Sequence, residues 1–167
     1  LKYQKFDVRL VGNIGNPILL EKNIPVSGGM GGGSTDAAAV LHGLMRLWSF
    51  HPSRTLLQEL ALGLGADVPV CLRGRSTIME GIGDSLRDAP LLPGFWLVLA
   101  NPGVAVSTPL VFQARSGAFL PAVPLTDTPR SAEDLAAQLR ERRNDLTAAA
   151  ISLAPAVGEC LATLTGL

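Results

Sequence analysis

The 167-residue sequence is 47% hydrophobic and 17% charged, enough apolar content for a buried core in one domain or in two small ones. Fourteen basic residues balance fourteen acidic ones, which leaves no broad positive field of the kind that nucleic-acid binding needs. The longest uncharged apolar run, residues 95–100, is far too short to span a bilayer. We therefore expect neither a nucleic-acid partner nor a membrane partner.

The first 26 residues predict two strands. The stretch "KFDVRLV" at residues 5–11 alternates apolar and polar side chains, and "ILLEKNIPV" at residues 18–26 is a second apolar run. The turn-rich "GNIGNP" between them favours a direct connection of the two strands.

Five glycines then fall within six positions of the stretch "PVSGGMGGGSTDAAAV", residues 25–40. Such a cluster is expected where side chains must be absent or where φ must be positive. Thr35, Asp36 and three alanines predict the start of a helix after the glycines. Its predicted apolar face consists of Val40, Leu41, Leu44, Leu47 and Trp48.

A helix N-terminus binds anions through its free N–H groups and its dipole, and glycines let a phosphate approach the backbone closely. We therefore expect a phosphate site here rather than a flexible linker, because linkers rarely lead into an amphipathic helix. A Walker A loop does not fit, since Gly33 is followed by Ser34 with no lysine. The dinucleotide pattern G-x-G-x-x-G fits poorly as well, because it needs a glycine where Ser34 stands.

The middle of the chain predicts one helix and two strands. The stretch "SRTLLQELALGLG", from Ser53, predicts a helix that ends at Gly63 or Gly65. After it, "DVPVCLRG" at residues 67–74 and "STIMEGIG" at residues 76–83 predict a pair of strands.

Four residues with metal-binding or redox chemistry are expected to have structural roles. Cys71 and Cys160 lack the spacing of a disulfide framework or a metal site, so we expect buried thiols in a reducing compartment. His42 and His51 are isolated and are expected at the surface or at helix ends rather than as ligands.

The composition changes at "DAPLLPG", residues 88–94, which predicts a boundary, and the apolar "FWLVLANPG" at residues 95–103 predicts a buried strand. Residues 120–130 hold three prolines and are expected to form an exposed loop. A helix capped by Ser131 follows, with Leu135 and Leu139 on one face and a solvated basic end, "RERR". A further helix is expected over residues 144–164, interrupted near Pro155.

Several blocks follow one another in a recognisable order. They are "PVSGGMGGGSTDAAAVL", "GADVPV" at residues 65–70, "EGIGD" at residues 80–84, "NPGVAVSTPLVF" at residues 101–112 and "NDL" at residues 144–146. Over roughly residues 20–167 the chain resembles the GHMP kinases, and most of all the branch that phosphorylates 4-diphosphocytidyl-2-C-methyl-D-erythritol. Met30 replaces the usual leucine of that branch, and Thr35 replaces its second serine.

The resemblance implies an α+β fold of two domains. Residues 1–93 would form a ribosomal-protein-S5-like catalytic domain, and residues 94–167 an incomplete ferredoxin-like C-terminal domain. The family's Ala-Lys-Ile/Val-Asn-Leu and Gly-Tyr-His motifs have no match before residue 18, so neither Lys2 nor Lys5 is expected to act as the family's lysine. The sequence also stops before the family's Ser-Gly-Ser/Thr-Gly-Ala loop, and we expect a kinase that is incomplete at both ends.

The same resemblance implies the site residues. Asp67 is expected to be the catalytic base, although its spacing alone would equally suit an aspartate that caps a strand or turn before Pro69. Phe112 is expected to stack on cytosine, with Thr108 and Pro109 along the substrate path, and the alternative is a core phenylalanine. Asn144 and Asp145 are expected to have mostly structural roles. The residues expected to hold the ATP phosphates are Pro25, Gly28, Gly29, Gly31, Gly32, Gly33, Ser34 and Thr35.

The implied activity is ATP-dependent phosphorylation of the 2-hydroxyl of 4-diphosphocytidyl-2-C-methyl-D-erythritol, a step toward isoprenoid precursors in the non-mevalonate route. Mg²⁺ is implied by ATP, with no protein ligand for it that the sequence identifies. Two alternatives stay open: a GHMP kinase for another small alcohol, which would not need the aromatic Phe112, and an incomplete, non-catalytic nucleotide-binding protein. We expect a cytoplasmic protein, because no transit-like leader is seen.

Overall fold

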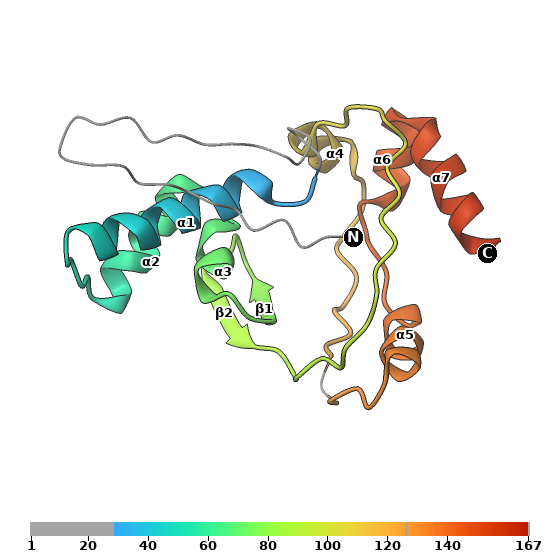
Figure 1. Cartoon of the computed structure of the whole chain (residues 1–167). Coiled ribbons are helices and arrows are strands. Elements are labelled where there is room, and N and C mark those ends of the chain that lie inside the picture. Colours follow the sequence, from blue (N-terminus) through green and yellow to red (C-terminus); the bar gives the residue numbers. More distant parts are fainter. Residues whose placement is uncertain (1–28, 126, 167) are drawn as a thin grey trace. The chain divides into compact units, whose positions relative to one another are not determined.

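The computed structural model describes residues 29–125 and 127–166 of the chain (Figure 1). The two strands predicted before residue 27 lie outside the described residues. The chain divides into two compact units, one ending at Ala89 and the other beginning at Pro90. The sequence predicts the boundary four residues later, between residues 93 and 94.

The first unit contains three helices and one β-hairpin in its described part. The two strands pair antiparallel, with Thr77 opposite Asp88 and Glu80 opposite Ser85. The elements, in chain order, are α1 (Gly32–Leu47), α2 (Arg54–Leu64), α3 (Val68–Arg73), β1 (Thr77–Glu80) and β2 (Ser85–Asp88).

The core of this unit lies where the three helices meet. It consists of Ala38 from α1, Ala61 from α2 and Val68 from α3, all buried, with Leu41 and Cys71 packed against them. Since the side chains at a helix contact set the distance between the axes, two alanines favour a close approach of the helices. The short α3 is therefore held between α1 and α2.

The α1 helix begins earlier than the sequence predicts, at Gly32 rather than near Thr35. The predicted apolar face is wrong at its C-terminal end, because Leu47 and Trp48 are exposed. The buried residues of α1 are Asp36 and Ala38, one to two turns from its N-terminus. The helix thus packs against the core around Ala38 and Leu41. The apolar residues at its C-terminal end continue the helical spacing but are not buried.

The prediction of a strand at residues 67–74 is wrong, because these residues form α3. Pro69 lies in the first turn of this helix, where proline is tolerated, and Gly74 ends it in the left-handed conformation with φ of 59°. A short apolar run of this kind fits a strand or a buried helix equally by periodicity. The strand predicted at residues 76–83 is confirmed over residues 77–80 only, and its partner is β2, which the sequence analysis did not predict.

The second unit is helical in its described part. Its α4 packs against α6, and α6 packs against α7, around the buried side chains of Val111 and Ala149. The α5 helix has Leu135 as its buried residue. The bounds are α4 (Thr108–Ala114), α5 (Ala132–Arg140), α6 (Thr147–Leu153) and α7 (Pro155–Thr165).

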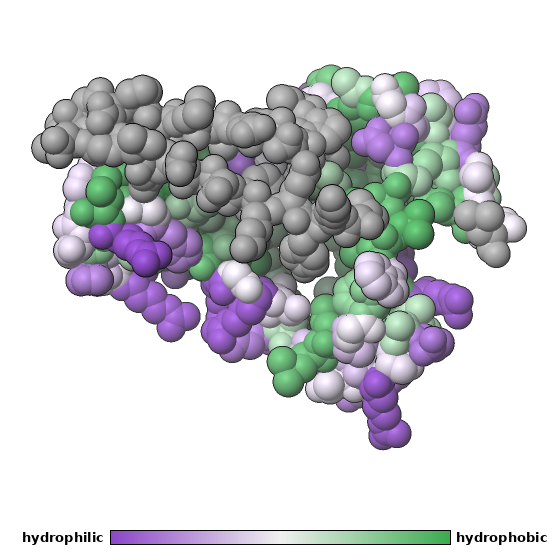
Figure 2. All heavy atoms as spheres, viewed as in Figure 1, coloured by the Kyte–Doolittle hydropathy of each residue, from purple (hydrophilic) through white to green (hydrophobic). Residues whose placement is uncertain are grey.

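The predicted buried strand at residues 95–103 is wrong. Trp96 is 90% exposed and Val98 is 84% exposed, and the described part of this unit contains no strand. A strand needs a partner for its backbone groups, and here no described segment supplies one. Figure 2 shows apolar side chains, in green, between hydrophilic ones, in purple, on the visible face.

Four local predictions are confirmed. The α2 helix begins after Ser53 and ends before Gly65, and α5 is capped by Ser131. The predicted last helix is interrupted at Pro155, where Ala154 adopts an extended φ of −144° because a residue before proline avoids the helical region. Residues 120–130 form a loop over the positions that the structure describes.

The acidic residues of the first turn of α5 are stabilised in their charged forms. The side chain of Ser131 lowers the pKa of Glu133 by a hydrogen bond. The backbone N–H of Arg130, which donates to the Asp134 carboxylate at 2.8 Å, lowers the pKa of Asp134, and the Gln138 side chain adds to this effect. Both carboxylates belong to the capping structure of α5.

The two cysteines are half-buried, so the prediction of buried thiols is wrong in degree. His42 and His51 are exposed, as predicted. His42 Nε2 lies 3.2 Å from the Leu72 carbonyl oxygen, which ties α1 to α3. Within residues 29–125 and 127–166, no helix has the length and apolar character needed to cross a membrane.

Three serine N-caps provide a test of the local structure. Ser53 Oγ accepts from Leu56 N and Ser131 Oγ accepts from Asp134 N, both at 3.2 Å, whereas Ser107 before α4 makes no capping bond with its side chain. Ser53→Ala and Ser131→Ala should each lower the free energy of unfolding by about 0.5–2 kcal/mol. Ser107→Ala is the matched control and should change it far less. Urea unfolding measures the three changes, and an equal loss in all three variants would contradict the assignment of the caps.

Candidate functional site

The described part of the glycine stretch forms the entry into α1. Gly29 and Gly31 adopt positive φ angles of 70° and 67°, which glycine alone adopts readily. Gly32 and Gly33 open the helix, and α1 has no capping hydrogen bond from a side chain. Pro25 and Gly28, also predicted to hold phosphate, lie outside the described residues.

The glycines of this entry face open space. A Cβ placed on Gly29, Gly31, Gly32 or Gly33 would meet no atom within 4 Å in the described structure. Packing against the described residues therefore gives no reason for glycine at these four positions. Bare backbone at a helix N-terminus is suited to the close approach of an anion.

Ser34 and Thr35 complete the first turn of α1. Thr35 donates twice to the Gly31 carbonyl oxygen, from its N–H at 2.9 Å and from Oγ1 at 3.1 Å. Its Oγ1 also lies 3.7 Å from Cys71 Sγ of α3. The first turn of α1 is thus in contact with α3.

Asp67 immediately precedes α3, the helix that Thr35 contacts. It occupies the N-cap position of α3, and its carbonyl oxygen accepts from Cys71 N at 3.2 Å, one helical turn away. The structure therefore brings the first turn of α1 and the residue predicted to be the base into the same region of the first unit. The sequence places them more than thirty residues apart.

The side chain of Asp67 is exposed and makes no capping hydrogen bond. The next two residues, Val68 and Pro69, are buried and fix the backbone beneath it. The interpretation of Asp67 as a capping aspartate therefore finds no support in the described contacts. An exposed carboxylate on a fixed backbone is free to accept a proton from a bound hydroxyl.

The second unit contains the residues predicted to bind the substrate. Thr108 and Pro109 are exposed in the first turn of α4, and Phe112 is 52% exposed one turn later. The alternative of a core phenylalanine is wrong, since Val111 is the buried residue of this helix. Thr108 and Phe112 are four positions apart, which places them on one face of α4.

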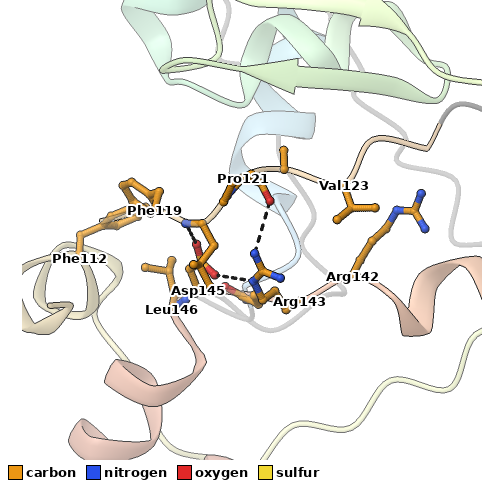
Figure 3. Close-up of a pocket in the computed structure, with 11 residues that line it drawn as sticks. Phe112, Phe119, Pro121, Val123, Arg142, Arg143, Asp145 and Leu146 are labelled. Atoms are coloured by element: carbon orange, nitrogen blue, oxygen red, sulfur yellow. Dashed lines mark hydrogen bonds and ion pairs between the residues drawn. The ribbon is translucent and has the colours of Figure 1, made fainter. Parts of the chain in front are cut away.

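Phe112 lines a groove of about 480 Å³ (Figure 3). Phe112 and Phe119 lie together at one end of this groove in the view, and Val123 and Arg142 lie at the other. Thr108 and Pro109 are not among its lining residues. The full lining consists of Phe112, Phe119, Leu120, Pro121, Ala122, Val123, Arg142, Arg143, Asn144, Asp145 and Leu146.

The wall of the groove is held by charged side chains. Asp145 accepts from Leu120 N at 2.9 Å and from Arg143 Nε at 3.3 Å, and Arg143 also donates to the Pro121 carbonyl oxygen at 3.4 Å (Figure 3). Arg142 donates to the Pro124 carbonyl oxygen at 2.8 Å. The prediction of a solvated "RERR" end is wrong for Arg142, which is half-buried, whereas Arg143 is exposed as predicted. Both side chains fasten the proline-rich loop.

Sequence reasoning missed these partners because they lie 18 to 25 positions apart. It also missed Phe119, whose ring carries the Arg115 guanidinium 3.5 Å from its centroid, within the range of a cation–π contact. The structural role of Asn144 is supported, since its Oδ1 accepts from Leu146 N at 3.0 Å. For the contacts of Arg142, Arg143 and Asp145 with the loop, the one signal in the sequence was the adjacent "RR" and "ND" after a proline-rich segment.

The predicted site residues belong to both units. The described phosphate-loop residues and Asp67 lie in the first unit, and Thr108, Pro109 and Phe112 lie in the second. The described residues contain no group of three or more His, Cys, Asp or Glu side chains that could hold a metal ion.

Comparison with known proteins identifies the first unit. Residues 3–75 match the N-terminal domain of the GHMP kinases. This match includes the glycine stretch, α1, α2, Asp67 and α3.

Curated relatives cover most of the chain. It is 55% identical to the 4-diphosphocytidyl-2-C-methyl-D-erythritol kinase of Paramagnetospirillum magneticum over 150 residues. The aligned region is 90% of this chain and 53% of the relative. It is 50% identical to the kinase of that name from Rhodospirillum rubrum, over 90% of this chain and 49% of the relative. It is 46% identical to the one from Parvibaculum lavamentivorans, over 90% and 53%. The chain thus spans about half the length of these relatives.

The glycine entry, the helix that follows it and the aspartate at the start of α3 all lie inside the matched domain. Residues 3–75 of the chain therefore carry the N-terminal domain of the GHMP kinases.

Proposed function

We propose that this chain belongs to a kinase that transfers the γ-phosphoryl group of ATP to the 2-hydroxyl of 4-diphosphocytidyl-2-C-methyl-D-erythritol, in the cytoplasm. The observation that carries the proposal is the contact of α3 with the first turn of α1, through Thr35 and Cys71. That contact supports the proposal because it joins the first turn of α1, the candidate phosphate site, to the helix that follows Asp67, the candidate base. The names of the relatives, at 46–55% identity, support the choice of substrate.

The γ-phosphoryl group requires a cradle of hydrogen-bond donors, because phosphoryl transfer depends on positioning and on charge stabilisation. The backbone N–H groups at the start of α1 are suited to this role, and Gly31 to Gly33 leave them uncovered by side chains. Ser34 and Thr35 would add hydroxyl donors from the same turn. We assign the ATP phosphates to this entry.

The acceptor hydroxyl must lose its proton as the new P–O bond forms. The Asp67 carboxylate is exposed, sits on a buried backbone and is not engaged in capping its own helix. It would accept that proton as the substrate oxygen attacks phosphorus and ADP leaves. We therefore assign the role of general base to Asp67.

The cytosine end of the substrate needs a flat apolar surface. The half-exposed ring of Phe112 provides one at the edge of the groove in the second unit. Stacking tolerates a planar base without a fixed pattern of hydrogen bonds. A GHMP kinase for a different small alcohol would not need this ring, so Phe112 distinguishes the two kinases.

Mg²⁺ would accompany ATP. The described residues offer no three-ligand cluster, so they do not fit a metal site built from protein side chains alone. A Mg²⁺ ion bound with a nucleotide takes most of its ligands from phosphate oxygens and water, and it would neutralise phosphate charge there. No step assigned to Asp67 or Phe112 depends on it.

Replacement of the phosphate-loop glycines should abolish ATP binding. Gly31→Val puts a branched side chain at positive φ, and Gly32→Val fills the open space where a phosphate would approach. Two controls match these changes away from the loop: Gly74→Val, with φ of 59°, and Gly63→Val, inside α2. Calorimetric titration with ATP and a thermal midpoint on each preparation check the effect. Wild-type ATP affinity in both loop variants would refute the assignment.

Replacement of Asp67 should affect turnover rather than ATP affinity. Asp67→Asn keeps the shape of the side chain but removes the base, so kcat should fall by about two to four orders of magnitude. The measurement is phosphorylation of the cytidyl substrate, followed by detection of the phosphorylated product, beside ATP titration. Glu59→Gln changes an exposed carboxylate on α2 and should leave kcat unchanged.

Measurements on the parent protein, which carries no substitution, distinguish a kinase from a non-catalytic nucleotide-binding protein. An active parent with less than a tenfold loss of kcat in Asp67→Asn would show that Asp67 is not the base. A parent that binds ATP but never forms the product would favour the nucleotide-binding protein.

Replacement of Phe112 should weaken substrate binding selectively. Loss of the stacking ring in Phe112→Ala should cost about 1 to 3 kcal/mol of cytidyl-substrate affinity, roughly one to two decades in Kd, while ATP affinity holds. Phe50→Ala is the matched control, because Phe50 is 47% exposed and lies in the first unit. Titration of both ligands measures the effect. Unchanged cytidyl affinity in a folded Phe112→Ala variant would favour another small alcohol as the substrate.

A further inference from the structure

The turn between β1 and β2 lies against the loop that carries Asp67. Gly83, in this turn, has φ of 92°, and a Cβ on it would lie 2.2 Å from the Ala66 carbonyl oxygen and 3.0 Å from the Ala66 carbonyl carbon. Both atoms are backbone, so they cannot move aside as the end of a flexible side chain would. Glycine is therefore required at Gly83 by the close approach of two backbone segments as well as by its φ.

Ala66 is the residue immediately before Asp67. It lies between the end of α2, at Gly65, and the start of α3, and Val68 N donates to the Gly65 carbonyl oxygen at 3.1 Å. The backbone at residues 65–67 is thus a tight connection of two helices. A displacement of Ala66 would therefore also shift the backbone of Asp67, to which it is joined by a peptide bond.

The turn itself is fixed on two sides. Within the hairpin, Asp84 Oδ1 accepts from Ile82 N at 3.0 Å, and Gly83 N donates to the Glu80 carbonyl oxygen at 3.3 Å. From α2, Gln58 Nε2 donates to the Asp84 carbonyl oxygen at 2.8 Å. The turn is therefore braced by hydrogen bonds within the hairpin and from α2, and in this fixed conformation it lies against Ala66.

We propose that Gly83 is a positioning residue for the reaction: its missing side chain lets the braced β1–β2 turn seat against Ala66 and so sets the place of the Asp67 carboxylate. This inference rests on the proposed role of Asp67 as the base. A base acts only within hydrogen-bond reach of the hydroxyl, and a displacement of about 1 Å can cost about a hundredfold in rate. Gly83 itself touches neither substrate nor ATP in this proposal.

The test compares two glycine-to-alanine variants with different surroundings. Gly83→Ala must push the turn and the Ala66 backbone apart, whereas Gly74→Ala adds a Cβ at φ of 59° with no atom within 4 Å. Gly83→Ala should lower kcat by about tenfold to a hundredfold with unchanged KM for ATP, because the phosphate loop belongs to α1. Gly74→Ala should keep the parent kcat. Equal losses of kcat in the two variants would overturn the proposal. A raised KM for ATP with an unchanged kcat in Gly83→Ala would overturn it as well.

A double variant shows whether Gly83 acts through Asp67. If it does, Asp67→Asn with Gly83→Ala should be no slower than Asp67→Asn alone, because the displaced carboxylate is already ineffective. Multiplicative losses would mean that Gly83 supports some other part of the protein, and the proposal would fall.

Two further measurements keep the test decisive. If Gly83→Ala does not fold, Gln58→Ala removes the brace from α2 without adding atoms, and it should lower kcat severalfold at unchanged KM for ATP; an unchanged kcat would overturn the proposal. If the parent has no kinase activity, the proposed function fails, but hydrogen exchange still tests the contact. The Val68 amide should exchange faster in Gly83→Ala than in Gly74→Ala, and equal exchange rates would refute the positioning role.

Discussion

The packing of α3 into the angle between α1 and α2 is the contact on which the first unit depends. Three small side chains, Ala38, Ala61 and Val68, meet there and are almost fully buried. Burial of a valine side chain stabilises a protein by about 1.5 to 3 kcal/mol, and the alanines contribute mainly by allowing the helices to approach. Because Val68 follows Asp67 directly, the contact that forms the core also fixes the start of the helix before which Asp67 lies.

Glycine serves two opposite purposes around this core. At the entry to α1, Gly29 and Gly31 supply positive φ and leave open space in which a ligand can approach the backbone. At the β1–β2 turn, Gly83 has no side chain, so the backbone of the turn can lie against the backbone of Ala66. In our proposals, the first use leaves room for a phosphate, and the second fixes the backbone next to Asp67, the candidate base.

The second unit is organised around charge and exposed apolar surface. The ion pair of Arg143 with Asp145 and the bonds of Asp145 and Arg142 to the loop create the wall of the groove beside Phe112. Such exposed pairs contribute little to stability in themselves, so their value here lies in fixing the geometry of a loop that has few apolar contacts. The exposed run from Phe95 to Leu99 has no such fastening among the described residues.

The sequence by itself determined the features that depend on neighbouring residues. The caps at Ser53 and Ser131 and the break at Pro155 act within three or four positions, and the ordered family blocks pointed to the GHMP kinases before any contact was known. Tertiary structure decided the rest: residues 67–74 became a helix because α1 and α2 bury one face of it, and residues 95–103 did not form a strand because no described segment pairs with them. The fastening of the groove by Arg143 was likewise hidden, since it joins positions 22 apart. Helix caps and breaks depend on residues close together in the sequence, whereas burial and strand pairing depend on which distant segments the fold brings together.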